Sequence, residues 1–261
     1  MDLDDAYANG PYIPHADTYP PKWAKEASAF RTALGKRAAL DVVYGDGPRQ
    51  TLDLFHPEGA AAGTVVFIHG GYWRAFDKST WSHFAGGALA RGWRVAMPSY
   101  DLCPQVRIGD ITHQIQKAVT KVALECDGPL RITGHSAGGH LTARMVAPGM
   151  LAADIAARVH KIVPISPLSD LEPLMKTSMN ADFKLTRESA KAESPIHQPQ
   201  PGMPVTVLVG AQERPAFISQ AKDLGQAWSA DVVTEDNKHH FDVIDGLCDP
   251  DSALTNAVLG S

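Results

Sequence analysis

Cysteine is scarce in this sequence, and long apolar runs are lacking. The chain has 261 residues and only three cysteines, Cys103, Cys126 and Cys248, none of them in a CxxC pair. Widely spaced cysteines in an odd number predict no disulfide framework and favour the reducing environment of the cytoplasm. No stretch of 18 apolar residues could span a membrane, and the acidic start MDLDDAYANG lacks the basic and apolar regions of a signal peptide. We therefore expect a cytoplasmic protein with no membrane partner.

An excess of positive charge is also missing. Lys and Arg number 24 against 29 Asp and Glu, which gives a formal net charge of -5. Such a chain has no electrostatic footprint for nucleic acid, so we expect no nucleic-acid partner. The 11 histidines fall into no HExxH or Cys/His ligand spacing, and no phosphate-binding glycine motif is present. The sequence therefore predicts neither a metal site nor a cofactor.

Strand-sized apolar runs alternate with helical stretches along most of the chain. A composition of 44% hydrophobic and 20% charged residues is ordinary for a globular protein. Runs such as TVVFIH read as strands buried on both faces, because helices cover both sides of a parallel sheet. Strands are expected over 64–69, 93–98, 130–133, 161–165, 205–209 and 231–233, and helices over 79–91, 110–125, 137–147 and 215–229. We predict a single α/β domain over 1–261 with a mostly parallel sheet.

Two further segments are predicted to flank this alternation. Residues 1–38 form an N-terminal arm and helix: four prolines and three tyrosines in 1–22 indicate an extended arm, and helical spacing of apolar residues follows over 23–34. Next, 39–44 and 51–56 predict an antiparallel hairpin at the sheet edge. The polar stretch 171–201 is too long for a simple loop, and we interpret it as a small, helical, cap-like insertion.

The motif Gly134-His135-Ser136-Ala137-Gly138 is the sharpest chemical signal. This GxSxG follows a predicted strand and precedes a predicted helix, and such a tight turn tolerates only glycine at its two ends. The turn exposes the hydroxyl of Ser136 as a nucleophile and leaves the Ala137 N–H unpaired at a helix start, where it can bind an oxyanion.

A second motif, His69-Gly70-Gly71-Tyr72-Trp73, ends the first buried strand. The N–H groups of Gly70 and Gly71 are predicted to complete the oxyanion hole. Tyr72 and Trp73 are candidates for the substrate pocket, with ordinary packing beside the sheet an equal alternative.

A serine nucleophile needs a base and an acid that orients the base. In GxSxG hydrolases the serine, the acid and the histidine follow one another along the chain, which points to His240, with His239 as its rival. His135 and His140 lie too close to the serine in sequence. Glu213, in the turn after a strand, is the favoured acid, and Asp170, one strand earlier, is the alternative with a capping role as its ordinary explanation.

Several segments together resemble the arylformamidase (kynurenine formamidase) branch of the α/β-hydrolases, close to the hormone-sensitive-lipase-like esterases. They are HGGYW, YDLCP, GHSAGGHL and HFDVI, together with the earlier QTLDLFHP. The resemblance implies an α/β-hydrolase fold, a nucleophile at Ser136, the histidine His240 directly before Phe241, and an acid at Glu213. The family usually has Asp at this last position, so Glu is a departure.

The resemblance implies a serine hydrolase of a small-molecule acyl substrate, with N-formylkynurenine cleaved to kynurenine and formate. A carboxylesterase for short-chain acyl esters would use the same residues. A non-catalytic binding protein on a hydrolase scaffold is the third hypothesis, and it predicts a broken set of catalytic residues. The sequence does not give the oligomeric state.

Overall fold

The computed structural model describes residues 2–260, and its centre is an eight-stranded sheet. The strand order is β1-β2-β4-β3-β5-β6-β7-β8, and β2 runs antiparallel to both of its neighbours while the other strand pairs are parallel. This confirms the predicted α/β fold with an antiparallel hairpin at its edge. The strands are β1 (Ala38–Val43), β2 (Thr51–Phe55), β3 (Thr64–Ile68), β4 (Arg94–Pro98), β5 (Leu130–His135), β6 (Val159–Ile165), β7 (Thr206–Gly210) and β8 (Asp231–Glu235).

Alternating side chains of the central strands enter two separate cores. In β3, Val66 and Ile68 belong to one core cluster, whereas Val65 and Phe67 belong to the other. Every residue of β3 is buried, because successive side chains point to opposite faces of the sheet and both faces are covered.

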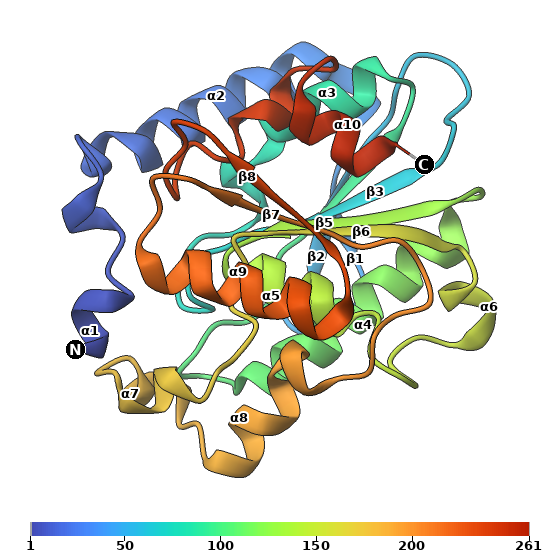
Figure 1. Ribbon diagram of the computed structural model, residues 1–261. Coiled ribbons are helices and arrows are strands. Elements are labelled where there is room, and N and C mark those ends of the chain that lie inside the picture. The colour runs from blue at the N-terminus through green and yellow to red at the C-terminus, as the bar shows by residue number, and fades with distance from the viewer. Residues whose placement is uncertain (1, 261) are drawn as a thin grey trace.

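Helices cover the two faces of the sheet (Figure 1). On one side lie α2 (Tyr19–Leu34), α3 (Gly86–Ala90) and α10 (Ala253–Leu259); on the other lie α4 (Ile108–Glu125), α5 (Ala137–Arg144) and α9 (Pro215–Trp228). The remaining helices are short: α1 (Leu3–Ala6), α6 (Ala153–Ala156), α7 (Asn180–Phe183) and α8 (Arg187–Glu193). Within the described part of the chain, no helix is long and apolar enough to cross a membrane.

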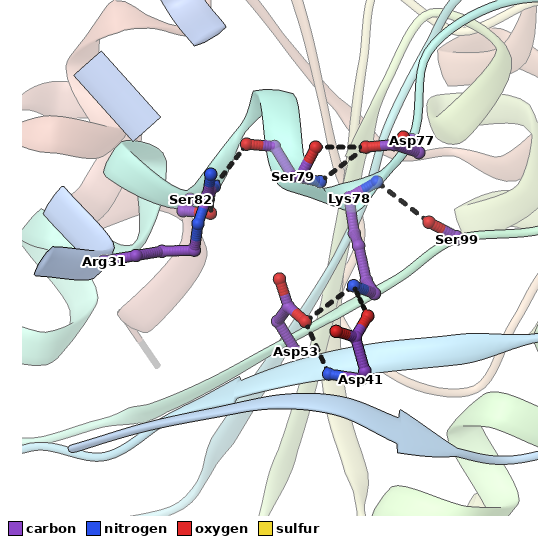
Figure 2. A network of polar contacts seen from close by, with 8 residues as sticks. All are labelled: Arg31, Asp41, Asp53, Asp77, Lys78, Ser79, Ser82 and Ser99. Carbon is purple, nitrogen blue, oxygen red and sulfur yellow. Dashed lines mark hydrogen bonds and ion pairs between the residues drawn. The ribbon is translucent and has the colours of Figure 1, made fainter. Parts of the chain in front are cut away.

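A buried ion pair fixes the edge hairpin to the segment that follows β3 (Figure 2). Lys78 Nζ lies 2.8 Å from Asp53 Oδ1 of β2 and 2.6 Å from Asp41 Oδ1 of β1. The Lys78 N–H also donates to Ser99 Oγ at 2.9 Å. Asp53 is 1% exposed, so its charge depends on this ammonium group for compensation.

The N-terminal segment differs from the extended arm that its prolines suggested. It folds into α1 and two 3-10 turns, and α2 begins at Tyr19, four residues before the predicted start. Pro20 and Pro21 lie in the first turn of α2, where no N–H is needed for the helix ladder and proline is well tolerated. The prolines therefore start the helix here.

Two other predicted segments are short helices in the structure. The predicted helix over 79–91 is broken into 3-10 turns at Lys78–Thr80 and Ser82–Ala85, followed by α3. The stretch 171–201 contains α7 and α8 between 3-10 turns at Pro173–Lys176 and Pro195–His197. Figure 1 shows α7 beside α1, so the insertion lies next to the N-terminal segment.

Candidate active site

Ser136 occupies a strained turn between β5 and α5. Its φ is +58° and its ψ is -118°, a combination that L-residues rarely adopt. A Cβ on Gly138 would lie 1.9 Å from the carbonyl oxygen of Ile68, and one on Gly134 would lie 2.5 Å from that of Gly138. The two glycines are therefore required by the close approach of backbone on both sides of the serine.

His240 and Glu213 form a buried pair at the carboxyl edge of the sheet. His240 Nδ1 lies 2.6 Å from Glu213 Oε2, and the two side chains are 4% and 0% exposed. Glu213 follows β7 and His240 follows β8, so adjacent parallel strands bring them together. This geometry leaves Nε2 of His240 as the ring nitrogen free to handle a substrate proton.

The second carboxylate oxygen of Glu213 is held by the protein. Oε1 accepts a hydrogen bond from the Gly210 N–H at 2.9 Å and another from the hydroxyl of Ser166. Ser166 is fully buried and directly follows β6. The sequence analysis missed it, although a serine directly after a buried strand was a usable signal.

The rivals of these two residues point elsewhere. Asp170 Oδ1 accepts the N–H of Glu172 at 2.9 Å, which is the capping role that its sequence position suggested. His239 contacts Asp242 through Nδ1 at 3.1 Å and the Tyr19 hydroxyl through Nε2 at 3.1 Å.

Backbone N–H groups without acceptors lie beside the serine. Among residues 2–260, the N–H groups of Gly70, Gly71, Tyr72 and Ala137 donate to no protein acceptor. Gly71 and Tyr72 line the same cavity as Ser136. Gly70 does not line it; a Cβ there would meet the carbonyl oxygen of His135 at 2.8 Å. Gly71 therefore lies on the cavity wall, whereas Gly70 lies next to it beside His135 and Ser136; the contribution of both N–H groups to an oxyanion hole stays a prediction.

Tyr72 lines the cavity, but Trp73 does not. The Tyr72 hydroxyl donates to the carbonyl oxygen of Tyr7 at 2.6 Å. Trp73 is fully buried, with its ring edge-on to His140 and Phe183 at 5.1 and 5.5 Å. The structure therefore agrees with the packing alternative for Trp73, because its bulky ring lies in the core beneath the loop.

Burial keeps two histidines near the nucleophile, His69 and His135, neutral. It lowers the pKa of His69 to about 4 and that of His135 well below its usual range, with the neighbouring His240 lowering the latter further. The His135 and His240 ring centroids are 4.6 Å apart. A neutral His135 can pack on His240 without repelling an imidazolium.

A single cavity of about 870 Å³ contains Ser136 and His240. The N-terminal segment supplies part of its wall, including Tyr7 and Asn9, and the 171–201 insertion supplies Ser178, Met179 and Asp182. Sequence reasoning missed the arm as a part of the site. In the region that the structure describes, no three His, Cys, Asp or Glu side chains are grouped as metal ligands would be.

Known proteins are similar to this chain in sequence. A family model described as alpha/beta hydrolase fold matches residues 65–228. The kynurenine formamidase of Salmo salar is 28% identical over 84% of this chain and 80% of its own length.

Two solved structures are also similar. A Silicibacter sp. protein described as a candidate thioesterase is 56% identical, with a TM-score of 0.97 and 99% of each chain covered. Esterase 2 of Thermogutta terrifontis, phosphoramylated by tabun, has a TM-score of 0.63 at 18% identity, covering 78% of this chain and 84% of its own. The latter likeness concerns the fold alone.

Proposed function

The chain belongs to the α/β-hydrolase fold family, and from this membership we propose that it is a serine hydrolase that cleaves an aryl formamide or a small acyl ester. The observation that carries the proposal is the buried 2.6 Å contact between His240 Nδ1 and Glu213 Oε2, with His240 lining the cavity that also holds Ser136. A buried carboxylate on one imidazole nitrogen makes the other an effective base.

In the proposed reaction, Ser136 Oγ attacks the carbonyl carbon and His240 Nε2 takes the hydroxyl proton. Glu213 holds the Nδ1–H tautomer and stabilises the imidazolium. The N–H groups of Gly70, Gly71 and Ala137 bind the oxyanion that develops on the carbonyl oxygen. His240 then protonates the leaving nitrogen or oxygen as the bond to the acyl carbon breaks.

The second half of the reaction regenerates the serine. Water attacks the acyl carbon and gives a proton to His240, which passes it to Ser136 Oγ as the bond between Oγ and the acyl carbon breaks. The acyl group leaves as the acid, which ionises to a carboxylate in water. With a formamide the acyl product is formate and the first product is the free amine. For N-formylkynurenine, the amine is kynurenine.

The formamide is favoured by the likeness to kynurenine formamidases over most of the chain. A carboxylesterase for short acyl esters is the alternative, because the same groups would act on both bonds. The relative described as a candidate thioesterase makes an acyl thioester a third substrate to include.

The test is a substrate panel with the wild type and four variants. N-formylkynurenine, p-nitrophenyl acetate and acetyl-coenzyme A are compared by kcat/KM. We expect the formamide to be preferred and Ser136→Ala and His240→Ala to lose at least about a thousandfold. Glu213→Gln should lose on the order of a thousandfold because its amide cannot stabilise the imidazolium, whereas Asp170→Asn, its matched control, should keep near wild-type activity. Full activity in Ser136→Ala would overturn the proposal, and an ester preference would select the alternative.

A covalent probe provides an independent test of Ser136 as the nucleophile. Paraoxon should add one diethylphosphoryl group to Ser136, seen as a mass shift on the peptide that contains it. Absence of labelling in an active enzyme would contradict a serine nucleophile.

A further inference from the structure

The charged side chains that line the active-site cavity are confined to one region of its wall. Apart from histidines, they are Asp4 of α1, Arg74 of the loop after β3 and Asp182 of α7. Arg74 Nη1 lies 2.7 Å from Asp182 Oδ2. Asp4 Oδ1 accepts hydrogen bonds from the N–H and hydroxyl of Ser178 at 2.6 and 2.9 Å. Three segments far apart in sequence thus bring one cation and two anions to the same part of the cavity.

These groups have bonding capacity that the protein does not use. Within residues 2–260, Nε and Nη2 of Arg74 donate to no acceptor, and neither Asp182 Oδ1 nor Asp4 Oδ2 accepts a hydrogen bond. The Arg74 and Asp182 side chains are each 37% exposed, so a ligand can reach them. A guanidinium group pairs well with a carboxylate, and a carboxylate with an ammonium.

Another part of the lining is aromatic and uncharged. Trp23 lies 4.8 Å from Trp81 and 5.5 Å from Phe241, measured between ring centroids. Trp23, Trp81 and Phe241 all line the cavity. An aromatic leaving group fits such a surface. A volume of about 870 Å³ also exceeds what a small acyl ester would fill.

We propose that Arg74, Asp182 and Asp4 bind the α-carboxylate and α-ammonium groups of an amino-acid substrate, here called its head. The aromatic part of the same substrate lies on the uncharged lining. Arg74 would bind the α-carboxylate through its free N–H groups, while Asp182 and Asp4 would bind the α-ammonium. The inference rests on the proposed function and deepens it: it names the residues that would select a ring formamide carrying an α-amino-acid group over one without it. The three residues determine specificity and do not take part in bond breaking.

The test compares two formamides that differ only in the amino-acid head. N-formylkynurenine carries it, and 2-formamidoacetophenone has the same ring and formamide without it. We expect the wild type to prefer the first at least tenfold in kcat/KM. Arg74→Gln should lose about tenfold on N-formylkynurenine through KM, with kcat unchanged, and less than twofold on the headless compound. Asp182→Asn and Asp4→Asn should act in the same direction.

A control variant outside the cavity completes the design. Lys121→Ala removes an exposed ion pair with Glu125 on α4 and should change neither substrate. Equal losses on both formamides would overturn the proposal, because they would mean that Arg74 only fixes α7 to the loop. A wild type without preference would overturn it as well.

Failure of the proposed function has a different signature. In that case neither formamide is hydrolysed while p-nitrophenyl acetate is, and the head is then tested by inhibition of the ester reaction. Kynurenine should inhibit at least tenfold more strongly than 2-aminoacetophenone in the wild type and lose this advantage in Arg74→Gln. Equal inhibition by the two compounds would contradict the proposal that the protein binds the amino-acid head.

Discussion

Ser166 donates a hydrogen bond to the carboxylate of Glu213 on the side opposite to His240. The hydroxyl contacts Oε1, while Oε2 faces the imidazole Nδ1 at 2.6 Å. A buried carboxylate has broad freedom about its last torsion unless both oxygens are held. Ser166 thus acts as a positioning residue for the proposed acid, and it links the ends of β6 and β7 at the site.

Replacing Ser166 by alanine should lower kcat about tenfold or more, because a hydrogen bond to a charged group is worth about 1.5–3 kcal/mol. The loss should appear equally with ester and formamide, since the acid serves both reactions. Thr133→Val is the matched control: it removes a buried hydroxyl that donates to the Val163 carbonyl oxygen away from the acid. A Ser166→Ala enzyme with unchanged kcat would show that the Gly210 N–H alone holds this side of the carboxylate.

Gly138→Ala should prevent stable folding or lower stability by more than about 3 kcal/mol. The new Cβ would lie 1.9 Å from the Ile68 carbonyl oxygen, and backbone on both sides leaves no room to relax. Gly202→Ala serves as the control, because a Cβ there meets nothing within 4 Å. Thermal unfolding monitored by circular dichroism compares the two, and similar midpoints would contradict the steric account of the turn.

Lys78→Met should lower the free energy of unfolding by about 3–5 kcal/mol, because it leaves Asp53 charged and buried without a cation beside it. The side chains of Lys78 and Asp53 are only 9% and 2% exposed. Lys121→Met breaks an exposed pair and should cost no more than about 0.5 kcal/mol. Urea denaturation measures both. Adding Asp53→Leu to Lys78→Met should restore part of the loss, and no recovery would argue against the uncompensated charge.

Stability should fall as the pH drops below about 6.5. Burial lowers the pKa of His140 from 6.5 to about 4. Between these two pH values, His140 is mostly protonated in the unfolded chain and mostly neutral in the folded protein. The contribution of His140 is complete above 6.5 and is lost as the pH falls towards 4, with about 2 kcal/mol gone at pH 5. His69 acts in the same direction.

The variant His140→Gln isolates this effect. Glutamine can keep the contact that His140 Nε2 makes with the Glu193 carbonyl oxygen at 2.8 Å, but it does not protonate. Its free energy of unfolding should fall less than that of the wild type between pH 7.5 and 5. His160→Gln, at an exposed position, should leave the wild-type difference unchanged. An identical pH dependence in His140→Gln would contradict the assignment.

The sequence by itself determined the features that depend on neighbouring residues. Continuous apolar runs predicted the strands of a sheet covered on both faces, and GxSxG between a strand and a helix predicted a strained serine. Such features follow from side-chain period and backbone sterics within a few positions. The prediction of an extended arm failed because Pro20 and Pro21 are compatible with both an extended segment and a first helical turn. The neighbouring residues do not distinguish the two.

Only the tertiary structure decided which distant residues meet. Glu213 faces His240, while Asp170 caps a turn; Trp73 is buried, and Arg74, one residue later, reaches the cavity beside Asp182. Each of these outcomes depends on how strands, the arm and the insertion close around one edge of the sheet. Contacts between segments more than a hundred residues apart are set by the folding of the whole chain, and no local pattern records them.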